Sequence, residues 1–334
     1  MNPRRGPITH LVRALVVGGS ELETLAITRR LTRFRHRVLR PARFADWEPS
    51  IRERFGAEVE VATSAKWEQE LERARLLHIQ FPFLLTSDPV GHDSVLELGH
   101  LPRVPTLFTV HAAVNVPVVP ELHYVFHTAA LRQRFPELPD ERCTVVPSLV
   151  ELPPEAPRRT LRERTRILWV SRNEDAKFHP DLAGICAEVL RACPTAEFRF
   201  VGRPENFALP VHERVSSIPC PAVDLAAEYR AADLFWSFPH PLLEETWCRT
   251  VTEAMGAGLP CVVAAHGAPA WQLAADQAGR VAATPAACAT ELIDLVRAPE
   301  LRARLGARGR QRALDFARDA QNVLDELYSR FLPS

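Results

Sequence analysis

Short apolar runs alternate with amphipathic stretches along this chain, and the alternation restricts its fold more than any other feature. In the first half the apolar runs lie at residues 13–19, 36–41, 76–81, 106–111, 122–127 and 144–150. In the second half they lie at residues 166–171, 198–202, 234–238 and 260–265. The stretches between them have the periodicity of helices that bury one face. Strands that alternate with helices predict a parallel sheet with crossover helices, so we expect an α/β fold.

Residues 151–165 interrupt this alternation with three prolines and a cluster of charges, which is typical of a linker. We therefore predict a first domain at 1–152 and a second at 166–317, each a doubly wound, Rossmann-like sheet. Ligands of open α/β sheets bind outside the carboxyl ends of the strands. Two such domains facing a central cleft would hold the ligand there.

The overall composition excludes several classes of protein. The chain has 334 residues, of which 46% are hydrophobic and 25% charged, and its formal net charge of +0 argues against a nucleic-acid partner. No apolar run approaches the roughly 18 residues of a membrane span. Seven scattered cysteines without CxxC pairs predict reduced thiols in a cytoplasmic protein. The HExxH pattern is missing, so we expect neither a metal site nor a bound cofactor.

The loop after the run at 166–171 carries two cations, Arg172 and Lys177, just before a helix expected to begin near His179. Cations beside a helix N-terminus form a natural anion site, because the amides of the first turn also attract negative charge. Only Lys66 and Lys177 among the 41 basic residues are lysines, which marks Lys177 as a candidate for a required point charge. The alternative is a solvated loop in which the cations pair with acidic neighbours.

Two glutamates follow in the segment 239–263. Glu245 precedes an expected helix and Glu253 lies inside it, eight positions further on. A helix has about 3.6 residues per turn, so two residues eight positions apart lie on roughly the same face of it. The backbone amides of residues 246–249, at the N-terminus of that helix, would face a phosphate. The alternative is a pair of surface glutamates on an ordinary helix.

Three further features carry weaker signals. Gly267 follows a buried strand, where backbone can approach a ligand closely. Gly18 and Gly19 end the first expected strand, although they do not form a GxGxxG motif. His111 ends another strand at the expected cleft, where a polar role in an active site and a structural role are about equally favoured.

Together these motifs resemble the retaining glycosyltransferase family four, which has the GT-B fold. The order of Arg172, Lys177, Glu245, Glu253 and the following AMGAGLPCVV is similar to that family's pattern, and the N-terminal half is similar more loosely. The resemblance implies a nucleoside-diphosphate sugar as donor, transfer of a hexose to a hydroxyl acceptor with retention, and no metal. It also implies a terminal helix, residues 318–334, that returns to the first domain.

The resemblance further implies a role for each matching residue. Arg172 and Lys177 would stabilise the leaving diphosphate, where negative charge develops. Glu245 would orient the donor sugar, His111 would contact it near the reacting carbon, and Glu253 would hold the ribose. The remaining donor-binding positions implied are Gly18, Gly19, Thr246, Trp247, Cys248 and Arg249.

The chain departs from the family pattern at several positions, chiefly Ser171, Phe178, Trp247, Cys248 and Trp271. Cys248 adds a side chain at a point of close phosphate approach, which puts that contact in question. Two alternatives therefore stay open. One is a catalytically silent GT-B subunit that binds a partner or a polysaccharide, and the other is an epimerase on the same fold.

The acceptor is less well specified by the sequence. A small soluble molecule is favoured, because the acceptor-side first domain is short, and we expect a bacterial, cytoplasmic enzyme. Seven arginines in the stretch Arg29–Arg43 raise a second prediction, a basic patch that draws the protein to anionic lipid at the inner face of the membrane. A solvated helix face is the alternative.

Overall fold

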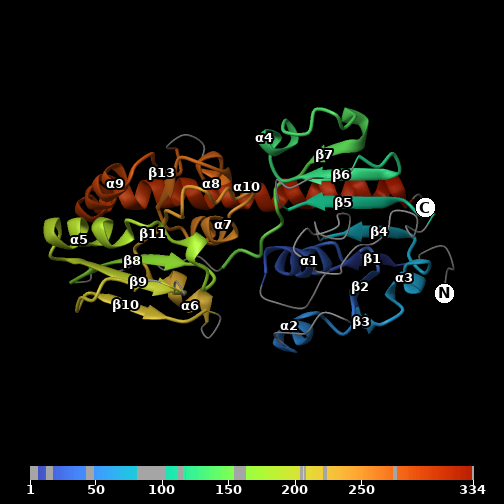
Figure 1. The fold of residues 1–334 in the computed structure, drawn as a ribbon, viewed down its shortest axis with the longest axis horizontal. Coiled ribbons are helices and arrows are strands. Elements are labelled where there is room, and N and C mark those ends of the chain that lie inside the picture. The colour runs from blue at the N-terminus through green and yellow to red at the C-terminus, as the bar shows by residue number, and fades with distance from the viewer. Residues whose placement is uncertain are drawn as a thin grey trace. The chain divides into compact units, whose positions relative to one another are not determined.

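The structure is a computed structural model that describes residues 7–12, 18–42, 49–80, 103–111, 116, 118–153, 163–203, 206, 208–220, 224–273 and 277–332. The chain divides into two compact units: unit 1 comprises Met1–Val150 and Phe316–Ser334, and unit 2 comprises Glu151–Asp315. Each unit contains one parallel sheet with helices beside it (Figure 1). The predicted fold class, two doubly wound α/β domains, is confirmed.

Unit 1 is built on a parallel sheet with the strand order β3-β2-β1-β4-β5-β6-β7. Its strands are β1 (Ile8–Leu11), β2 (His36–Pro41), β3 (Glu60–Ser64), β4 (Leu76–Ile79), β5 (Thr106–Val110), β6 (Leu122–Phe126) and β7 (Cys143–Val145). Its helices are α1 (Gly19–Arg30), α2 (Pro49–Arg54), α3 (Trp67–Leu71), α4 (Ala129–Arg132) and the short 3-10 helix η3 (Asp140–Arg142). The strand order reverses between β1 and β4, so the carboxyl ends of these strands mark the ligand-binding edge of such a sheet.

The sheet of unit 1 is buried on both faces. Leu76, Leu107 and Val125 pack in one cluster with α1 and the end of the chain, whereas their neighbours Leu77 and Phe108 pack in another with α3 and α4. Because successive side chains of a strand point to opposite faces, central strands covered on both sides read as continuous apolar runs. This is why the sequence shows the central strands clearly.

The first strand is not where the sequence predicted it. We expected a strand at 13–19, but β1 is Ile8–Leu11, and residues 13–17 lie outside the described residues. All four residues of β1 are buried, and they pair in parallel with β2 and β4, with Ile8 opposite His36 and Leu76. Long-range pairing with two neighbours thus selects the shorter and less apolar run as the central strand.

Unit 2 has a six-stranded parallel sheet in the order β10-β9-β8-β11-β12-β13, which repeats the first six strands of the unit 1 order. Its strands are β8 (Thr165–Val170), β9 (Ala196–Val201), β10 (Val215–Ile218), β11 (Leu234–Ser237), β12 (Cys261–Ala264) and β13 (Gly279–Ala282). Its helices are η4 (Asp175–Lys177), α5 (Leu182–Ala192), α6 (Leu225–Ala231), α7 (Arg249–Gly256), α8 (Ala268–Gln272) and α9 (Pro285–Arg297). The switch point of this sheet lies between β8 and β11.

An aromatic cluster fills one face of the unit 2 sheet. Trp169 and Trp236 are 4.8 Å apart in an edge-to-face arrangement, and Phe178 stacks on Trp169 at 5.5 Å. Phe178 is fully buried, so this departure from the family pattern fills the core beneath the loop that carries Lys177. The loop is therefore anchored by packing immediately after its cation.

The last helix, α10 (Pro299–Phe331), has 33 residues and belongs to both units. Its first part packs in unit 2, where Gly306 lies so close to the backbone of Gly258 that a Cβ would be 2.1 Å from the carbonyl oxygen. From Phe316 onward it is grouped with unit 1. There Leu324 and Leu327 join the hydrophobic cluster, and the hydroxyl of Tyr328 lies 2.7 Å from Nδ1 of His78.

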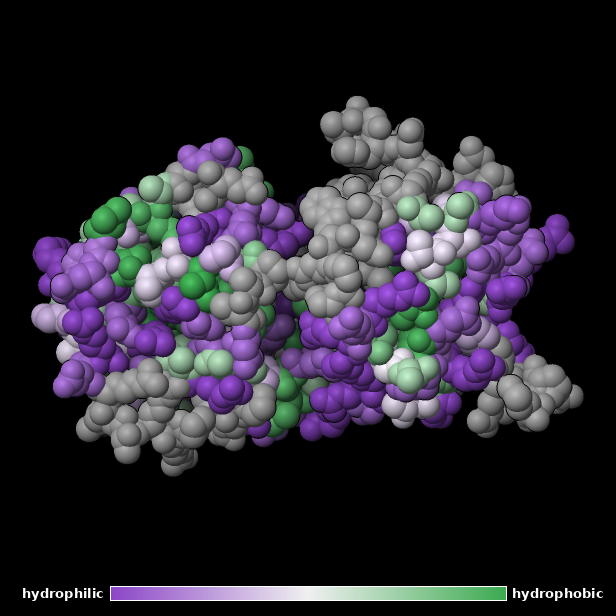
Figure 2. Space-filling view, turned by 90° about the horizontal axis from the view of Figure 1, so that it is seen from below, coloured by the Kyte–Doolittle hydropathy of each residue, from purple (hydrophilic) through white to green (hydrophobic). Residues whose placement is uncertain are grey.

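The surface is mixed in character. On the face drawn in Figure 2, the described hydrophobic residues lie in separate small groups among hydrophilic ones. Large hydrophobic residues with exposed side chains are Val118, Val145, Val211, Leu242, Trp271 and Leu314. Among the described helices, none combines the length and the apolar character that crossing a membrane requires.

Arg29, Arg30, Arg33 and Arg35 are exposed, whereas two other arginines of the stretch Arg29–Arg43 are buried, so the basic surface is smaller than the stretch and its contact with lipid stays a prediction. Arg37 and Arg40 lie on β2, an interior strand of the sheet, and are 2% and 6% exposed. Arg37 pairs with Glu60 at 2.8 Å and with Glu70. Buried guanidinium groups that are already paired are unavailable to lipid headgroups, and Arg43 lies outside the described residues.

Candidate functional site

The strongest of the expected sites lies in unit 2, at the carboxyl ends of β8 and β11. The loop after β8 leads through Arg172 into η4, which ends at Lys177, and the loop after β11 leads to Glu245 and then to α7. Since β8 and β11 are neighbours across the switch point, both loops emerge at the same edge of the sheet. The topology thus brings together two segments that are far apart in the sequence.

Lys177 and Glu245 meet at this edge. Nζ of Lys177 donates to Oε1 of Glu245 at 2.5 Å, and the two side chains are 18% and 16% exposed. Burial by itself lowers the pKa of Lys177, but the charge of Glu245 and its hydrogen bond raise it by more, so the net pKa lies above the ordinary value. Lys177 is therefore a permanent cation, and Glu245 holds its ammonium group in place.

Arg172 lies within electrostatic range of this pair, because its positive charge acts to lower the pKa of Lys177. Its own guanidinium is 3.2 Å from Glu174, and both side chains are about half exposed, at 56% and 44%. The pairing with an acidic neighbour is the arrangement expected for a solvated loop. An exposed pair of this kind is weak and can rearrange at little cost, so Arg172 can turn toward an anion.

The Gly267 loop positions Glu245. The backbone of Gly267 has a φ of +73°, and a Cβ there would lie 3.1 Å from the carbonyl oxygen of Glu245. The next residue, Ala268, donates its N–H to that same carbonyl at 2.9 Å. The close approach that the sequence predicted at Gly267 is therefore made by the backbone of Glu245.

The N-terminus of α7 differs in one respect from the sequence prediction. We expected the amide of Cys248 to face a phosphate, but its N–H donates to Oε1 of Gln272 at 3.0 Å. Nε2 of Gln272 returns a hydrogen bond to the carbonyl of Cys248 at 2.9 Å and a second to Oγ1 of Thr252 at 2.8 Å. Gln272 is fully buried and holds both backbone polar groups of Cys248, so the Cys248 N–H already has a hydrogen-bond acceptor within the protein.

The side chains of Cys248 and Trp247, next to Gln272, are buried. Cys248 is 4% exposed, and burial raises the pKa of its thiol to about 12, so the sulfur stays protonated. Trp247 donates from Nε1 to Thr252 at 3.1 Å and contacts Trp271 edge-to-face at 5.7 Å. Thr246 is only half-buried and follows Glu245 directly in the loop.

Glu253, on α7, has defined polar contacts. Its Oε2 accepts a hydrogen bond from the hydroxyl of Tyr229 on α6 at 2.9 Å, and its Oε1 lies 3.8 Å from Arg249. Tyr229 is thus a polar partner of this carboxylate that the spacing of the sequence does not reveal. Burial, followed by the charge of Glu253, raises the pKa of Tyr229 well above its ordinary value, so its hydroxyl remains a donor.

A hollow of about 730 Å³ opens beside the same loop. Its described lining includes Asp175, Ala176, His240 and Leu242, and neither Lys177 nor Glu245 is part of it. The hollow is mostly apolar and lacks the cations that a diphosphate requires. We therefore place the candidate site at the Lys177–Glu245 pair.

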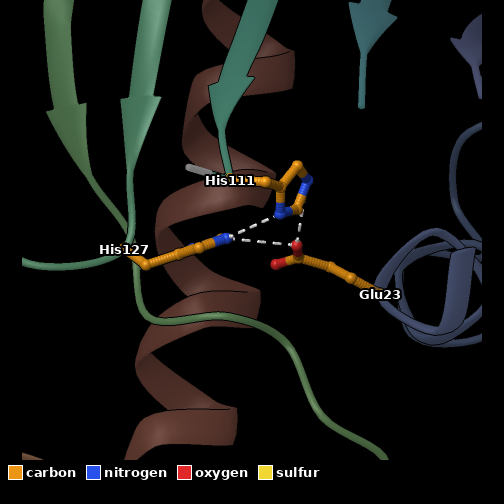
Figure 3. Close-up of side chains that lie close together, drawn as sticks. All are labelled: Glu23, His111 and His127. Atoms are coloured by element: carbon orange, nitrogen blue, oxygen red, sulfur yellow. Dashed lines mark hydrogen bonds and ion pairs between the residues drawn. The ribbon is translucent and has the colours of Figure 1, made fainter. Parts of the chain in front are cut away.

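The other expected residues, Gly18, Gly19 and His111, belong to unit 1. Gly18 caps α1 with an extended backbone, φ −118°, and Gly19 is the first residue of the helix, so this turn does not require the left-handed conformation. His111 follows β5 and lies in a cluster with Glu23 and His127, two residues that the sequence did not single out (Figure 3).

Comparison with known proteins identifies both a family region and the fold. Residues 218–312 match the family model described as glycosyl transferases group 1, a region that contains Glu245 and Glu253 but not Arg172 and Lys177. No curated protein is similar enough in sequence to match the chain. The resemblance stated from the motifs is confirmed for the matched region.

Solved structures match over almost the whole chain. Anabaena HepE in complex with UDP-glucose has 16% identity and a TM-score of 0.73, with 97% of this chain and 100% of that chain covered. WaaG, a glycosyltransferase involved in lipopolysaccharide biosynthesis, has 14% identity and a TM-score of 0.71, with 98% and 100% covered. Sucrose-phosphate synthase from Thermosynechococcus elongatus has 15% identity and a TM-score of 0.67, with 98% and 99% covered. The fold is that of the GT-B glycosyltransferases.

Proposed function

We propose that this chain, whose residues 218–312 match glycosyl transferases group 1 and whose fold is GT-B, transfers a hexose from a nucleoside-diphosphate sugar to a hydroxyl acceptor. Transfer would retain the configuration at the anomeric carbon, and the diphosphate would be held without a metal ion. A small soluble acceptor remains the favoured choice, and the protein would act in the cytoplasm.

The observation that carries this proposal is the Lys177–Glu245 pair at the switch point of unit 2, 2.5 Å between Nζ and Oε1. When a glycosidic bond to a diphosphate breaks, negative charge grows on the leaving oxygens. A preorganised cation stabilises that charge without reorganisation, because its position is already set by Glu245. Arg172, within electrostatic range, would add a planar donor fork suited to phosphate oxygens.

The remaining unit 2 residues would bind the rest of the donor. Glu253 can accept hydrogen bonds from a ribose diol through its carboxylate, with Tyr229 holding its orientation. Thr246, Trp247 and Arg249 flank the N-terminus of α7, where the helix dipole favours an anion. Cys248 would contribute shape rather than its amide, since Gln272 accepts that hydrogen bond.

The resemblance also implies roles for three residues of unit 1. His111, 16% exposed, would contact the hexose near the reacting carbon, and Gly18 and Gly19 would lie along the phosphates. HepE was solved with UDP-glucose and TarM with UDP, which makes a uracil nucleotide the first donor to test.

Isothermal calorimetry with UDP, GDP and ADP tests the donor site directly. We expect one nucleoside diphosphate to bind the wild-type protein, with equal affinity in EDTA and in Mg²⁺. Lys177→Ala should weaken that binding at least tenfold, because a cation worth more than about 1.4 kcal/mol is lost. Failure of all three nucleotides to bind would overturn the proposal and favour a silent GT-B subunit.

The stereochemical outcome requires a separate measurement. With the donor identified and an acceptor found by screening, proton NMR of the first product formed reports the anomeric configuration. Retention is expected, and inversion would contradict the proposed mechanism while leaving the donor site intact. Release of an epimerised sugar without any acceptor would identify the third alternative, an epimerase.

A further inference from the structure

Gln272 ends the short helix α8 and is fully buried against the start of α7, the helix beside it (Figure 1). Its Oε1 accepts the N–H of Cys248 at 3.0 Å, and its Nε2 donates to the carbonyl oxygen of Cys248 at 2.9 Å. The second hydrogen of Nε2 meets Oγ1 of Thr252 at 2.8 Å. A backbone N–H only donates and a carbonyl only accepts, so Cys248 determines which way the amide of Gln272 points.

Thr252 completes this set of hydrogen bonds. Its Oγ1 also accepts from Nε1 of Trp247 at 3.1 Å, and its hydroxyl donates to the carbonyl oxygen of Cys248 at 3.4 Å. A hydroxyl has one donor and two acceptor positions, so all three positions of Thr252 are used. Thr252 and Gln272 are 1% and 0% exposed. Buried polar groups that are all satisfied favour one arrangement, because a rotation would leave a donor or an acceptor without its partner.

The opposite end of α8 holds Glu245. The N–H of Ala268, the first residue of α8, donates to the carbonyl oxygen of Glu245 at 2.9 Å. The two ends of α8 therefore hold the two ends of the segment 245–248. The helix is in turn attached to α10, because Nε of Arg312 donates to the carbonyl oxygen of Gln272 at 2.5 Å.

The segment 245–248 joins two parts of the candidate donor site. Glu245, at its start, holds the ammonium group of Lys177, and Cys248, at its end, directly precedes the first turn of α7. The first amides of a helix lack partners within the helix and attract anions. A change in the backbone between these two points would shift the cation relative to the amides, and a displacement of about 1 Å can lower a rate by roughly 10²-fold.

We propose that Gln272 is a positioning residue of the donor site, which sets the start of α7 relative to the Lys177–Glu245 pair so that both can contact one diphosphate. This inference rests on the proposed function. An apolar side chain would leave both backbone polar groups of Cys248 without their partner. A glutamate could accept from the N–H but could not donate to the carbonyl, so the role requires an amide at this position.

The affinity of a nucleoside diphosphate relative to its monophosphate isolates this role, because the two ligands differ only in the second phosphate. Calorimetry with UDP and UMP, and with the corresponding guanine and adenine pairs, measures this ratio on the full chain. Gln272→Met and Gln272→Glu should each lower the preference for the diphosphate at least tenfold. A smaller amount of folded protein would lower the binding of both ligands equally and leave the ratio unchanged.

Leu190→Ala is the matched control. Leu190 is buried near the end of α5 that leads into β9, at the edge of the sheet opposite the candidate site. Its truncation should lower the melting temperature but keep the affinity ratio of the wild type. Thr252→Val removes one hydrogen bond of Gln272 and keeps both bonds to Cys248, so it should lower the ratio by less than the Gln272 variants do.

An unchanged ratio in the folded Gln272 variants, or in Thr252→Val if neither of them folds, would show that Gln272 serves the core alone and would overturn the inference. In that case the wild-type protein still prefers the diphosphate, and the proposed function stands. If the wild-type protein binds none of the three diphosphates, the proposed function fails and the inference fails with it. The wild-type titration therefore distinguishes the two failures.

Discussion

The two units share one strand order but carry different chemistry at the same edge of their sheets. In unit 2 the carboxyl ends hold a lysine–glutamate pair, a half-exposed arginine and the N-terminus of α7. In unit 1 they hold two histidines and a buried glutamate. The shared topology determines where a site forms, and the residues of the loops determine what it binds.

The hydrophobic interiors of the two units also differ in the kinds of side chain that they contain. Unit 2 is filled by stacked and edge-to-face aromatic rings around Trp169 and Trp236. Unit 1 places His10, His36 and His78 in its interior beside Tyr328. Polar groups buried in this way must keep their hydrogen bonds, so unit 1 depends more strongly on protonation state than unit 2 does.

The largest effect expected concerns the cation of unit 2. Lys177→Ala should lower turnover about 10²–10³-fold, as found when one group that stabilises developing charge is removed. Lys66→Ala is the control, since Lys66 is the second lysine of the chain and lies exposed at the start of α3 in unit 1. Steady-state kinetics with the identified donor measures both variants.

Equal activity of the two lysine variants would show that the pair at 177 and 245 is not the site of the chemistry. Melting temperatures of both variants, measured alongside, distinguish a lost charge from a lost fold.

The second prediction concerns the stability of unit 1 at low pH. Burial lowers the pKa of His78 to about 3, and burial together with His36 and His78 lowers the pKa of His10 well below its ordinary value. The unfolded chain binds protons at these histidines below pH 6.5, whereas the folded chain does not. Stability is therefore complete above pH 6.5 and falls as the pH drops, by about 1.4 kcal/mol per pH unit for each histidine.

Hydrogen exchange at pH 7.5 and pH 5.0, corrected for the intrinsic rates and measured in EDTA, compares the two units within one sample. Strands of unit 1 should lose protection at pH 5.0, and strands of unit 2 should keep more of theirs. The same loss in both units would contradict the idea that buried histidines distinguish them.

The third prediction concerns the loop that holds Glu245. Gly267 and Gly258 have φ values of +73° and +80°, so an alanine at either position is strained by about 1–2 kcal/mol. At Gly267 the new Cβ would also press on the backbone of Glu245, whereas at Gly258 nothing lies within 4 Å. Both variants should melt earlier, but only Gly267→Ala should weaken nucleoside-diphosphate binding.

Isothermal calorimetry of nucleoside-diphosphate binding to the two glycine variants tests whether Gly267 positions Glu245. If both bind the nucleotide equally well, Gly267 serves the turn alone and does not position Glu245.

The smallest effect concerns helix capping. The hydroxyl of Thr284 accepts from the N–H of Ala287 at the start of α9, so Thr284→Ala should lower the free energy of unfolding by about 1 kcal/mol. Thr290→Ala, on an exposed position of the same helix, is the control and should cost nothing. Thr128→Ala removes the corresponding cap of α4 in unit 1.

Denaturant titration of the three threonine variants measures these differences. A loss for Thr290→Ala as large as that for Thr284→Ala would mean that the cap contributes nothing specific.

The sequence by itself determined the architecture, because its main signals are local. Central strands buried on both faces appear as apolar runs, and helices between them show their periodicity, as in β2, β5, β6 and β11. The edge strands β3 and β10 were not anticipated, since they are short, half-buried and rich in polar residues. The sequence also indicated Lys177 and Glu245, which follow neighbouring strands.

Only the tertiary structure decided how distant side chains pair. The clamp of Gln272 on Cys248, the contact of Tyr229 with Glu253, and the convergence of Glu23 with two histidines join residues on different elements. The spacing of these residues along the chain follows no helical or strand period, so no local pattern of the sequence predicts these contacts. Such contacts depend on the packing that positions the loops. That packing forms only in the complete fold, so it cannot be inferred from a short stretch of sequence.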